Sequence, residues 1–253
     1  MGTFVGKRVA ITRPLLQSQE MMRAIANFGA EPKCYPLLEI RLLTDDPYFQ
    51  QAVQRDVDLV IFTSVNGVRA YVHARGEDVS VQSFPKALCV GEKTAEAAMR
   101  AGIHVIGLPE RYAAEYIVDL LRKNGAQGQR VLLVRGNLAD PLLSSALVEL
   151  GCDVLELIGY ETVPGTEARK LWDDIKNGDI DAVTFLSGSA ARVFAAAKNS
   201  DDQIGRVVVA AIGPKTQQIL VECQLPCHVV AQEATAFHLV HALANYFALA
   251  PDF

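Results

Sequence analysis

The chain has 253 residues, of which 50% are hydrophobic, and its 24 Lys and Arg against 29 Asp and Glu give a net charge of −5. This acidic balance argues against a broad nucleic-acid surface, and no apolar run approaches the roughly 18 residues that cross a bilayer. The N-terminus also lacks the apolar segment of a signal peptide. We therefore expect a cytoplasmic protein that binds neither nucleic acid nor membrane.

Short runs rich in Val, Ile and Leu alternate with segments of helical period along the chain. The runs predict buried strands at 8–12, 58–62, 87–90, 103–107, 130–134, 152–158, 181–186, 206–212 and 227–230. The periodic segments predict helices at 18–28, 65–74, 94–101, 113–123, 142–150, 190–197, 216–223 and 235–247. Strands and helices that alternate in this way indicate an α/β fold with parallel sheets flanked by helices.

The sequence repeats itself at an offset of about 122 residues, which marks an internal duplication. Four blocks keep their order and spacing in both copies: 7–13 matches 129–135, 58–64 matches 181–187, 90–94 matches 212–216, and 114–121 matches 236–243. Two copies of one unit, with a length above the usual single domain, predict two similar lobes of roughly 120 residues each.

Two proline-containing segments, 35–41 and 157–164, interrupt the alternation at equivalent places in the two copies. We interpret them as extended crossovers that run side by side as a two-stranded linker, with a cleft between the lobes nearby. The first lobe is then discontinuous and comprises 1–37 and 164–253. The second lobe comprises 42–158, and the linker strands are 38–41 and 159–163.

Hydroxyl, basic and small residues gather in the turns that follow the predicted strands. Because the carboxyl ends of parallel strands face the ligand crevice, and helix N-termini bind anions, these turns predict a carboxylate or phosphate site. Any single Ser or Thr there could instead be a helix N-cap. Basic residues recur at 13, 93, 135 and 215, however, which favours a multiply charged anion. The candidate binding residues are Arg13, Thr63, Ser64, Lys93, Thr94, Gly136, Asn137, Ser187, Gly188, Ser189, Lys215 and Thr216.

Several familiar kinds of site are not supported by the sequence. The turns at 91–94 and 213–216 lack the tail and spacing of a phosphate-binding loop, and no G-x-G-x-x-G follows the first strand. Cys223 and Cys227 form a single C-x3-C without a second pair, and His238 and His241 lack the spacing of a zinc-protease helix. We therefore expect no metal and no cofactor.

Tyr160 is the one candidate for a proton donor. It lies in the second crossover, where its phenol could donate a proton or hydrogen bond to a leaving oxygen. The first copy has no tyrosine at the equivalent position, which is expected if only one copy became specialised for catalysis. The alternative is a tyrosine that only packs in the linker.

Taken together, these motifs resemble the uroporphyrinogen-III synthase (HemD) family. The resemblance rests on blocks that cover nearly the whole chain, including Gly159-Tyr160-Glu161-Thr162-Val163 with its Tyr-x-Thr pattern; the others are 58–64, 90–94, 135–138, 185–189 and 211–216. It implies two α/β lobes joined by a two-stranded linker, no metal or organic cofactor, and a linear tetrapyrrole substrate, hydroxymethylbilane, that carries eight carboxylates.

The resemblance also implies a reaction and roles for residues. Hydroxymethylbilane would lose water, and its terminus would attack the substituted carbon of the last pyrrole, so that ring D is inverted in uroporphyrinogen III. Tyr160 matches a family tyrosine that assists departure of the hydroxyl group. The residues that match substrate-contacting positions are Thr63, Ser64, Thr94, Ser187 and Thr216, with Asn137, Arg13 and Lys215 as further matches.

Other functions stay open at this point. A non-catalytic two-lobe binder of anionic tetrapyrroles or other polycarboxylates would use the same cleft without turnover, and differs mainly in having no need of Tyr160. A sugar- or nucleotide-handling enzyme of similar build ranks last, because no acidic pair or diphosphate loop is present. We expect the protein to be a monomer.

Overall fold

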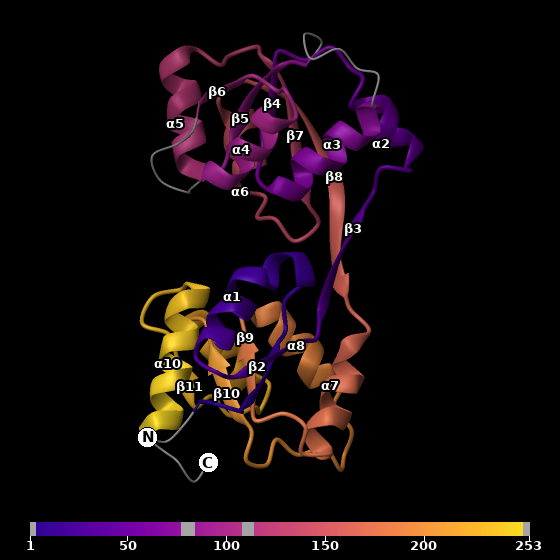
Figure 1. Cartoon of the computed structure of the whole chain (residues 1–253). Helices are drawn as coiled ribbons and strands as arrows, with labels where there is room; N and C mark the ends of the chain where they lie inside the picture. The colour runs from indigo at the N-terminus through magenta and orange to yellow at the C-terminus, as the bar shows by residue number, and fades with distance from the viewer. Residues whose placement is uncertain (1–3, 77–83, 108–113, 250–253) are drawn as a thin grey trace. The chain divides into compact units, whose positions relative to one another are not determined.

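The structure, a computed structural model, describes residues 4–76, 84–107 and 114–249. The chain divides into two compact units: unit 1 comprises Met1–Glu39 and Val163–Phe253, and unit 2 comprises Ile40–Thr162 (Figure 1). Unit 1 is therefore built from two separate segments of the chain. The finer prediction, that residues 38–41 and 159–163 serve as a linker between lobes ending at 37 and 164 and at 42 and 158, stays a prediction.

Unit 1 contains a five-stranded sheet in the order β11-β10-β9-β1-β2. All of its strand pairs are parallel. Its strands are β1 (Arg8–Ile11), β2 (Glu31–Cys34), β9 (Ala182–Phe185), β10 (Val208–Ala211) and β11 (Val229–Val230). Its helices are α1 (Leu15–Asn27), α7 (Glu167–Lys176), α8 (Gly188–Ala196), α9 (Pro214–Glu222) and α10 (Ala236–Leu249). The sheet joins strands from both sequence repeats.

Unit 2 carries most of a six-stranded sheet in the order β3-β8-β7-β4-β5-β6. Its strands are β3 (Leu38–Leu42), β4 (Leu59–Phe62), β5 (Lys86–Cys89), β6 (Val105–Gly107), β7 (Arg130–Gly136) and β8 (Asp153–Pro164), and its helices are α2 (Pro47–Ala52), α3 (Val65–Arg75), α4 (Glu92–Arg100), α5 (Ala114–Asn124) and α6 (Leu142–Glu149). The backbone N–H of Leu43 donates to the Gly159 carbonyl, and that of Gly165 donates to the Leu37 carbonyl. The residue number therefore rises along one strand as it falls along the other. The edge strand β3 is therefore antiparallel to β8, whereas the strands from β8 to β6 are parallel.

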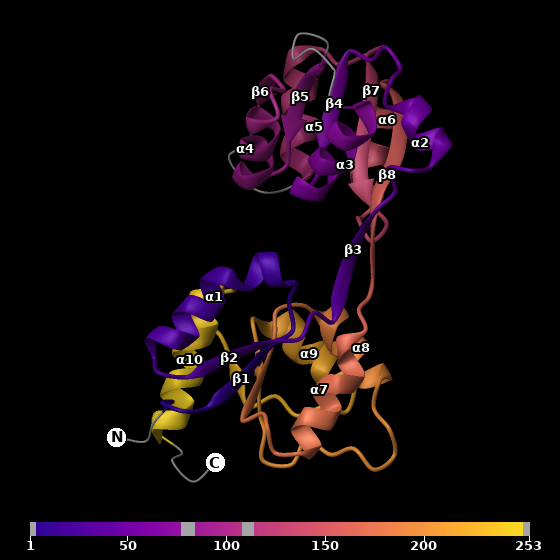
Figure 2. The same cartoon turned by 45° about the vertical axis from the view of Figure 1, so that its right-hand side comes forward.

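Helices cover both faces of each sheet, which gives each unit two apolar cores (Figures 1 and 2). In unit 1, α7, α8 and α9 pack on one face around Trp172 and Phe194, and α1 and α10 pack on the other. In unit 2, α2, α3 and α4 cover one face, and α5 and α6 cover the other. Central strands such as β4 and β9 are buried along their whole length, as expected for parallel sheets. None of the described helices is long and apolar enough to cross a membrane.

An equivalent ion pair closes the amino ends of the central strands in both units. In unit 1, Arg8 donates from its Nε and its backbone N–H to Asp181, at 3.0 and 2.8 Å. In unit 2, Arg130 donates in the same way to Asp58, at 3.2 and 2.9 Å. The duplication has therefore preserved an Asp–Arg contact at the edge of each sheet opposite to the carboxyl ends.

Most predicted elements are present, and three elements had not been predicted. Strand β2 contains Pro32, which argues against a strand, but β2 lies at the sheet edge, where proline is tolerated. Helix α2 is a short helix capped by Asp46, and α7 buries Leu171, Trp172 and Ile175 at helical spacing. The first residue of the predicted helix 113–123, and the ends of the first predicted lobe at 1–3 and 250–253, lie outside the described residues.

Candidate active site

The carboxyl edge of the unit 2 sheet brings Ser64, Gly136 and Tyr160 together. The chain runs from β4 to β5 and β6, and then crosses to β7 on the other side of β4, so that β4 and β7 form a topological switch point. Ligands of open α/β sheets bind at such points, outside the carboxyl ends of the strands. Ser64 follows β4, Gly136 ends β7, and Tyr160 lies on the adjacent β8.

A bulge at Gly159 sets the direction of Tyr160. The pairing of β7 with β8 shifts from Arg135 opposite Ile158 to Gly136 opposite Tyr160, which leaves Gly159 as the extra residue. A Cβ at Gly159 would lie 3.0–3.3 Å from side-chain atoms of Val134, Ala70 and Phe49, so that the backbone is pressed onto the core. Bulges of this kind re-aim a neighbouring side chain, and a glycine inside a strand is their sequence signal.

The Tyr160 ring lies against Gly136, where a side chain would have no room. A Cβ at residue 136 would lie only 2.5 Å from Tyr160 Cζ and 2.8 Å from its Oη. Asn137 fixes the strand on either side of the ring: its backbone N–H donates to the Tyr160 carbonyl at 3.2 Å, and its Oδ1 accepts from the Thr162 N–H at 2.9 Å. Gly136 and Asn137 therefore act on Tyr160, in addition to any contact with a ligand.

Ser64 connects Tyr160 to the start of α3. Its Oγ accepts from the Gly67 N–H at 3.1 Å as the N-cap of α3, and donates to Tyr160 Oη at 2.9 Å. Ser64 is therefore a helix N-cap, and it also contacts Tyr160. Because Ser64 donates in this pair, the half-buried phenol keeps its own O–H for another acceptor.

The other predicted residues of unit 2 lie near the same edge with different exposures. Thr63 directly follows β4 and is half-buried, Lys93 is exposed in the first turn of α4, and Thr94 is 5% exposed. The turn before α4 requires Gly91, whose φ of 95° lies in the left-handed region. Arg135, expected here as a countercharge, instead pairs with Glu156 at 2.8 Å and donates to the Asp140 carbonyl at 3.0 Å.

Unit 1 has an equivalent edge at its own switch point, between β1 and β9. Ser187 caps α8 by accepting from the Ala190 N–H at 3.2 Å, and Gly188 begins the helix, where a Cβ would lie 2.7 Å from Ile219 Cγ1. Ser189, Lys215 and Arg13 are exposed, and Arg13 Nε donates to Gln17 at 2.9 Å.

Two buried threonines complete the interior of that edge. Thr216 is 5% exposed in the first turn of α9, and Thr12 Oγ1 donates to the Thr184 carbonyl at 2.8 Å. Thr184 returns a hydrogen bond to the Ala10 carbonyl at 2.9 Å, so that these two hydroxyls hold β1 against β9.

Two contributors were not found from the sequence. Gly159 was seen only as part of a motif, although a glycine within a strand signals a bulge, and the Thr162 N–H that Asn137 accepts is a backbone group without any sequence signal. Among the described residues, no group of three or more His, Cys, Asp or Glu could hold a metal ion. The expectations of no metal and no cofactor stay predictions.

The fold and the site define a class of protein: a duplicated α/β protein that presents helix N-termini and hydroxyls at the carboxyl edges of both sheets, with a positioned phenol in one. A family model described as uroporphyrinogen-III synthase HemD matches residues 19–241. The chain belongs to the uroporphyrinogen-III synthase family.

Individual relatives agree with this assignment, and a solved structure agrees with the fold. A relative from Methanothermobacter thermautotrophicus that carries the same family name is 30% identical over 249 residues, covering 93% of this chain and 97% of its own. The uroporphyrinogen-III synthase of Chlorobaculum parvum is 24% identical, covering 89% of this chain and 93% of its own. The uroporphyrinogen-III synthetase structure from Helicobacter pylori has a TM-score of 0.68 at 19% identity, covering 95% of this chain and 99% of its own. The predicted family, α/β fold class and enzyme class, a cyclising lyase, are confirmed.

Proposed function

We propose that this chain closes hydroxymethylbilane to uroporphyrinogen III with loss of water and inversion of ring D, and that Tyr160 acts on the leaving hydroxyl group. Family membership supports the reaction. The observation that carries the role of Tyr160 is its position: the ring is packed on Gly136, its strand is fixed by Asn137, and its Oη accepts from Ser64 at the switch point of the sheet.

Loss of water from the substrate requires Tyr160 to act only as a proton donor. The C–O bond of the hydroxymethyl group breaks, and the oxygen leaves as water once it has received a proton. A phenol whose oxygen already accepts from Ser64 can turn its own O–H to that oxygen. The positive charge left on the terminal carbon is stabilised by the pyrrole nitrogen. The substituted carbon of the last ring then attacks this electrophilic carbon and gives a spiro intermediate. The bond that joins ring D to the rest of the chain breaks and re-forms at the free α-carbon of ring D, which inverts the ring and releases that carbon's proton.

The residues at the two carboxyl edges are proposed to hold the acidic side chains of the substrate. Unit 2 would contribute Thr63, Ser64, Lys93, Thr94, Gly136 and Asn137, and unit 1 would contribute Arg13, Ser187, Gly188, Ser189, Lys215 and Thr216. Eight carboxylates shared among hydroxyls, helix N-termini and exposed cations would curl the chain so that its ends meet. Each such hydrogen bond is worth on the order of 1 kcal/mol, so no single one dominates.

The location, oligomeric state and partners of the enzyme are also proposals. We propose a cytoplasmic monomer that binds neither nucleic acid nor membrane, supported by the net charge of −5 and by the described helices, none of which could cross a membrane. Sedimentation analysis of the purified protein tests the monomer, and a main species of twice the chain mass would contradict it.

The reaction is tested by mixing the purified protein with freshly generated hydroxymethylbilane, oxidising the products and separating type III from type I uroporphyrin. Because unassisted closure gives type I, we expect an excess of type III. Measurable bilane binding with only type I product would favour the non-catalytic binder of polycarboxylates.

The role of Tyr160 is tested by Tyr160→Phe, which keeps the ring on Gly136 and removes the hydroxyl. Loss of a general acid lowers turnover by about 100-fold or more, so we expect kcat to fall by roughly that factor while the KM for hydroxymethylbilane changes little. Ser64→Ala, which leaves the phenol in place, should lose far less turnover. Equal losses in two folded variants would show that Tyr160 has no distinct proton-donor role.

A further inference from the structure

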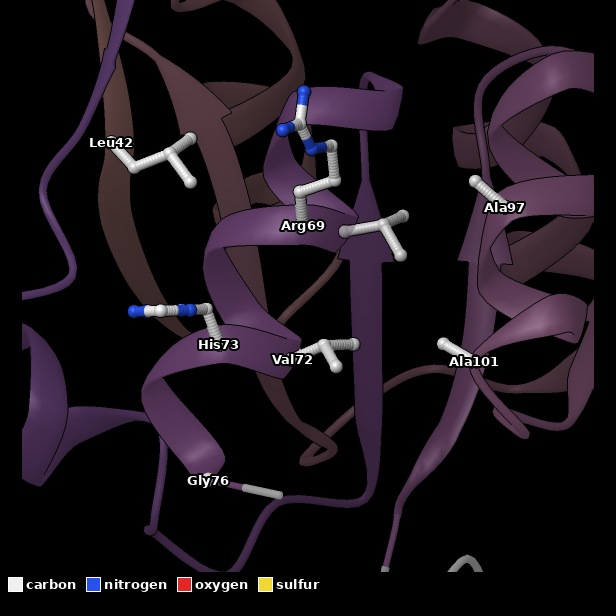
Figure 3. A pocket seen from close by; sticks show the side chains of 8 residues that line it. Leu42, Arg69, Val72, His73, Gly76, Ala97 and Ala101 are labelled. Atoms are coloured by element: carbon white, nitrogen blue, oxygen red, sulfur yellow. The ribbon is translucent and has the colours of Figure 1, made fainter.

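A groove in unit 2 lies over α3, away from the carboxyl edge that carries Tyr160. Its volume is about 420 Å³, and its sides are formed by Leu42 of β3, Ala97 of α4 and Ala101, which caps the end of α4 (Figure 3). The side chains of Arg69 and His73 project from α3, while Val72 points toward Ala101. None of these residues belongs to the proposed active site.

The groove combines an apolar surface with two cationic or hydrogen-bonding groups. Arg69 and His73 are four residues apart and therefore share one face of α3. Both are exposed, and neither side chain makes a hydrogen bond or ion pair with the part of the chain that the structure describes. Their N–H groups are free to bind an anion beside Val72 and Leu42.

In unit 1, the equivalent region has an acidic partner for its arginine and a larger apolar side chain in place of the groove. Arg192 is the counterpart of Arg69, and its guanidinium pairs with Glu222 of α9 at 3.0 Å. The counterpart of Glu222 in unit 2 is Arg100, which turns instead to Glu96 at 3.1 Å. Unit 2 has thus replaced the acid that would neutralise Arg69 with a second base.

The apolar packing differs between the units in a related way. Helix α9 presents Ile219, which packs against the core of unit 1 and reaches Gly188, whereas the counterpart of Ile219 in α4 is Ala97. In unit 2 the larger side chains, Val68 and Val72, lie on α3 instead. Because Ala97 and Ala101 carry only methyl groups, the space beside Val72 stays open as the groove.

We propose that this groove binds a small aromatic carboxylate. The ring lies on the half-buried Val72, between Leu42 on one side and Ala97 and Ala101 on the other, and the carboxylate accepts hydrogen bonds from Arg69 and His73. A volume near the lower end of the usual range for small-molecule sites suits one or two fused rings. The proposal stands independently of the cyclisation reaction, because it uses a different face of unit 2.

The test uses indole-3-acetate as the probe and indole-3-acetamide as its uncharged match, with binding followed by amide NMR shifts of the full chain. We expect shifts in α3 and α4 around residues 69–73 and 97–101, and at least 10-fold weaker binding of the amide. Equal affinity for acid and amide, or shifts confined to Ser64 and Tyr160, would overturn the proposal.

Three variants separate the two features of the groove. Arg69→Ala should weaken indole-3-acetate at least 10-fold without changing the weak binding of the amide. Ala97→Ile places the isoleucine of unit 1 in the groove and should weaken both probes. Arg192→Ala is the matched control in unit 1 and should leave both affinities unchanged. If Arg69→Ala and Ala97→Ile retain the spectrum of the folded protein and full affinity, the site is not this groove.

Discussion

The carboxyl edges of the two units began as copies of one another, yet only in unit 2 does the structure hold a phenol against the helix cap. In unit 1, Tyr35 follows β2, but its side chain is buried and donates to Asp174 at 2.6 Å. By the repeat offset, Tyr160 corresponds to Leu38 in the first copy, and Gly136 and Asn137 correspond to Pro14 and Leu15. Of the groups that contact Tyr160, only the helix cap is shared, as Ser64 in unit 2 and Ser187 in unit 1. The anion-binding character of the strand ends has thus survived duplication in both units, while the groups that hold a proton donor occur in unit 2 alone.

Among the groups that hold Tyr160, the largest effect is expected from Gly136→Ala. The added methyl would lie 2.5 Å from Tyr160 Cζ, so that the ring must move away from Ser64. A displacement of about 1 Å can cost on the order of 100-fold in turnover, and we expect kcat to fall by roughly 10- to 100-fold. Steady-state kinetics with hydroxymethylbilane measures this loss.

A double-mutant cycle shows whether Gly136 acts through the tyrosine. If Gly136 only positions the phenol, Gly136→Ala should cost little further turnover once Tyr160→Phe has removed the hydroxyl. Additive losses would instead assign Gly136 a direct role at the substrate. Amide NMR spectra of each variant establish that unit 2 remains folded.

Gly159→Ala tests whether the bulge itself distinguishes unit 2. The new methyl would approach Val134, Ala70 and Phe49 at 3.0–3.3 Å, and overpacking of this kind costs about 1–3 kcal/mol. We expect hydrogen exchange in β7 and β8 to rise accordingly. Trp172, the single tryptophan of the chain, is buried in unit 1. Its fluorescence serves as the control and should not change. Unchanged exchange in β8 would mean that the strand can accommodate the residue without the bulge.

The two helix caps offer a smaller and more symmetrical comparison. Ser64→Ala and Ser187→Ala each remove an N-cap hydrogen bond, which costs about 1 kcal/mol of helix stability. We expect similar rises in amide exchange at the starts of α3 and α8. Only Ser64→Ala also removes the hydrogen bond to Tyr160, so it should lower kcat more than Ser187→Ala, by about 3- to 10-fold in total. Equal kinetic losses would argue that the serines serve the substrate alone.

The sequence predicted the general arrangement of the fold because local patterns and tertiary packing agree there. The runs Leu59–Phe62 and Ala182–Phe185, apolar apart from Thr184, lie in the centre of the sheets, where both faces are buried. Strand β2 was not predicted because its proline is acceptable only at an edge, and edge position depends on the complete strand order. The antiparallel pairing of β3 likewise depends on a partner more than a hundred residues away.

The site was predicted in its residue types but not in its contacts. Tyr160, Ser64, Gly136 and Asn137 were all candidates, yet the sequence assigned the last three to the substrate. Three-dimensional contacts show that each of them also holds the tyrosine or its strand. Arg135 looked like a countercharge because it follows a strand, but an acidic partner on β8, Glu156, lies within reach. Such pairings arise between strands and leave no local pattern.

The smallest effects concern the shared Asp–Arg contacts at the opposite edges of the sheets. Hydrogen bonds from Arg130 hold the pKa of Asp58 at about 2, below its ordinary value of 3.8. At Asp181, burial raises the pKa, but the hydrogen bonds and charge of Arg8 outweigh it and leave the pKa lowered. A carboxyl whose pKa is lower in the folded state stabilises the fold above its unfolded pKa. This contribution of Asp58 is complete above about pH 4 and is lost as the pH falls toward 2.

Replacing the two arginines should therefore change the pKa values of the two aspartates by different amounts. Arg130→Gln should raise the pKa of the exposed Asp58 carboxyl only part of the way to its ordinary value, because the hydrogen bond from the backbone N–H of residue 130 remains. Arg8→Gln should raise the pKa of Asp181 further than that of Asp58, because the burial that the Arg8 side chain offsets remains, although the backbone hydrogen bond of residue 8 is kept. Carboxyl ¹³C shifts followed between pH 2 and 6 measure both values. Equal pKa values in the two variants would show that the duplicated contacts have kept the same surroundings as well as the same residues.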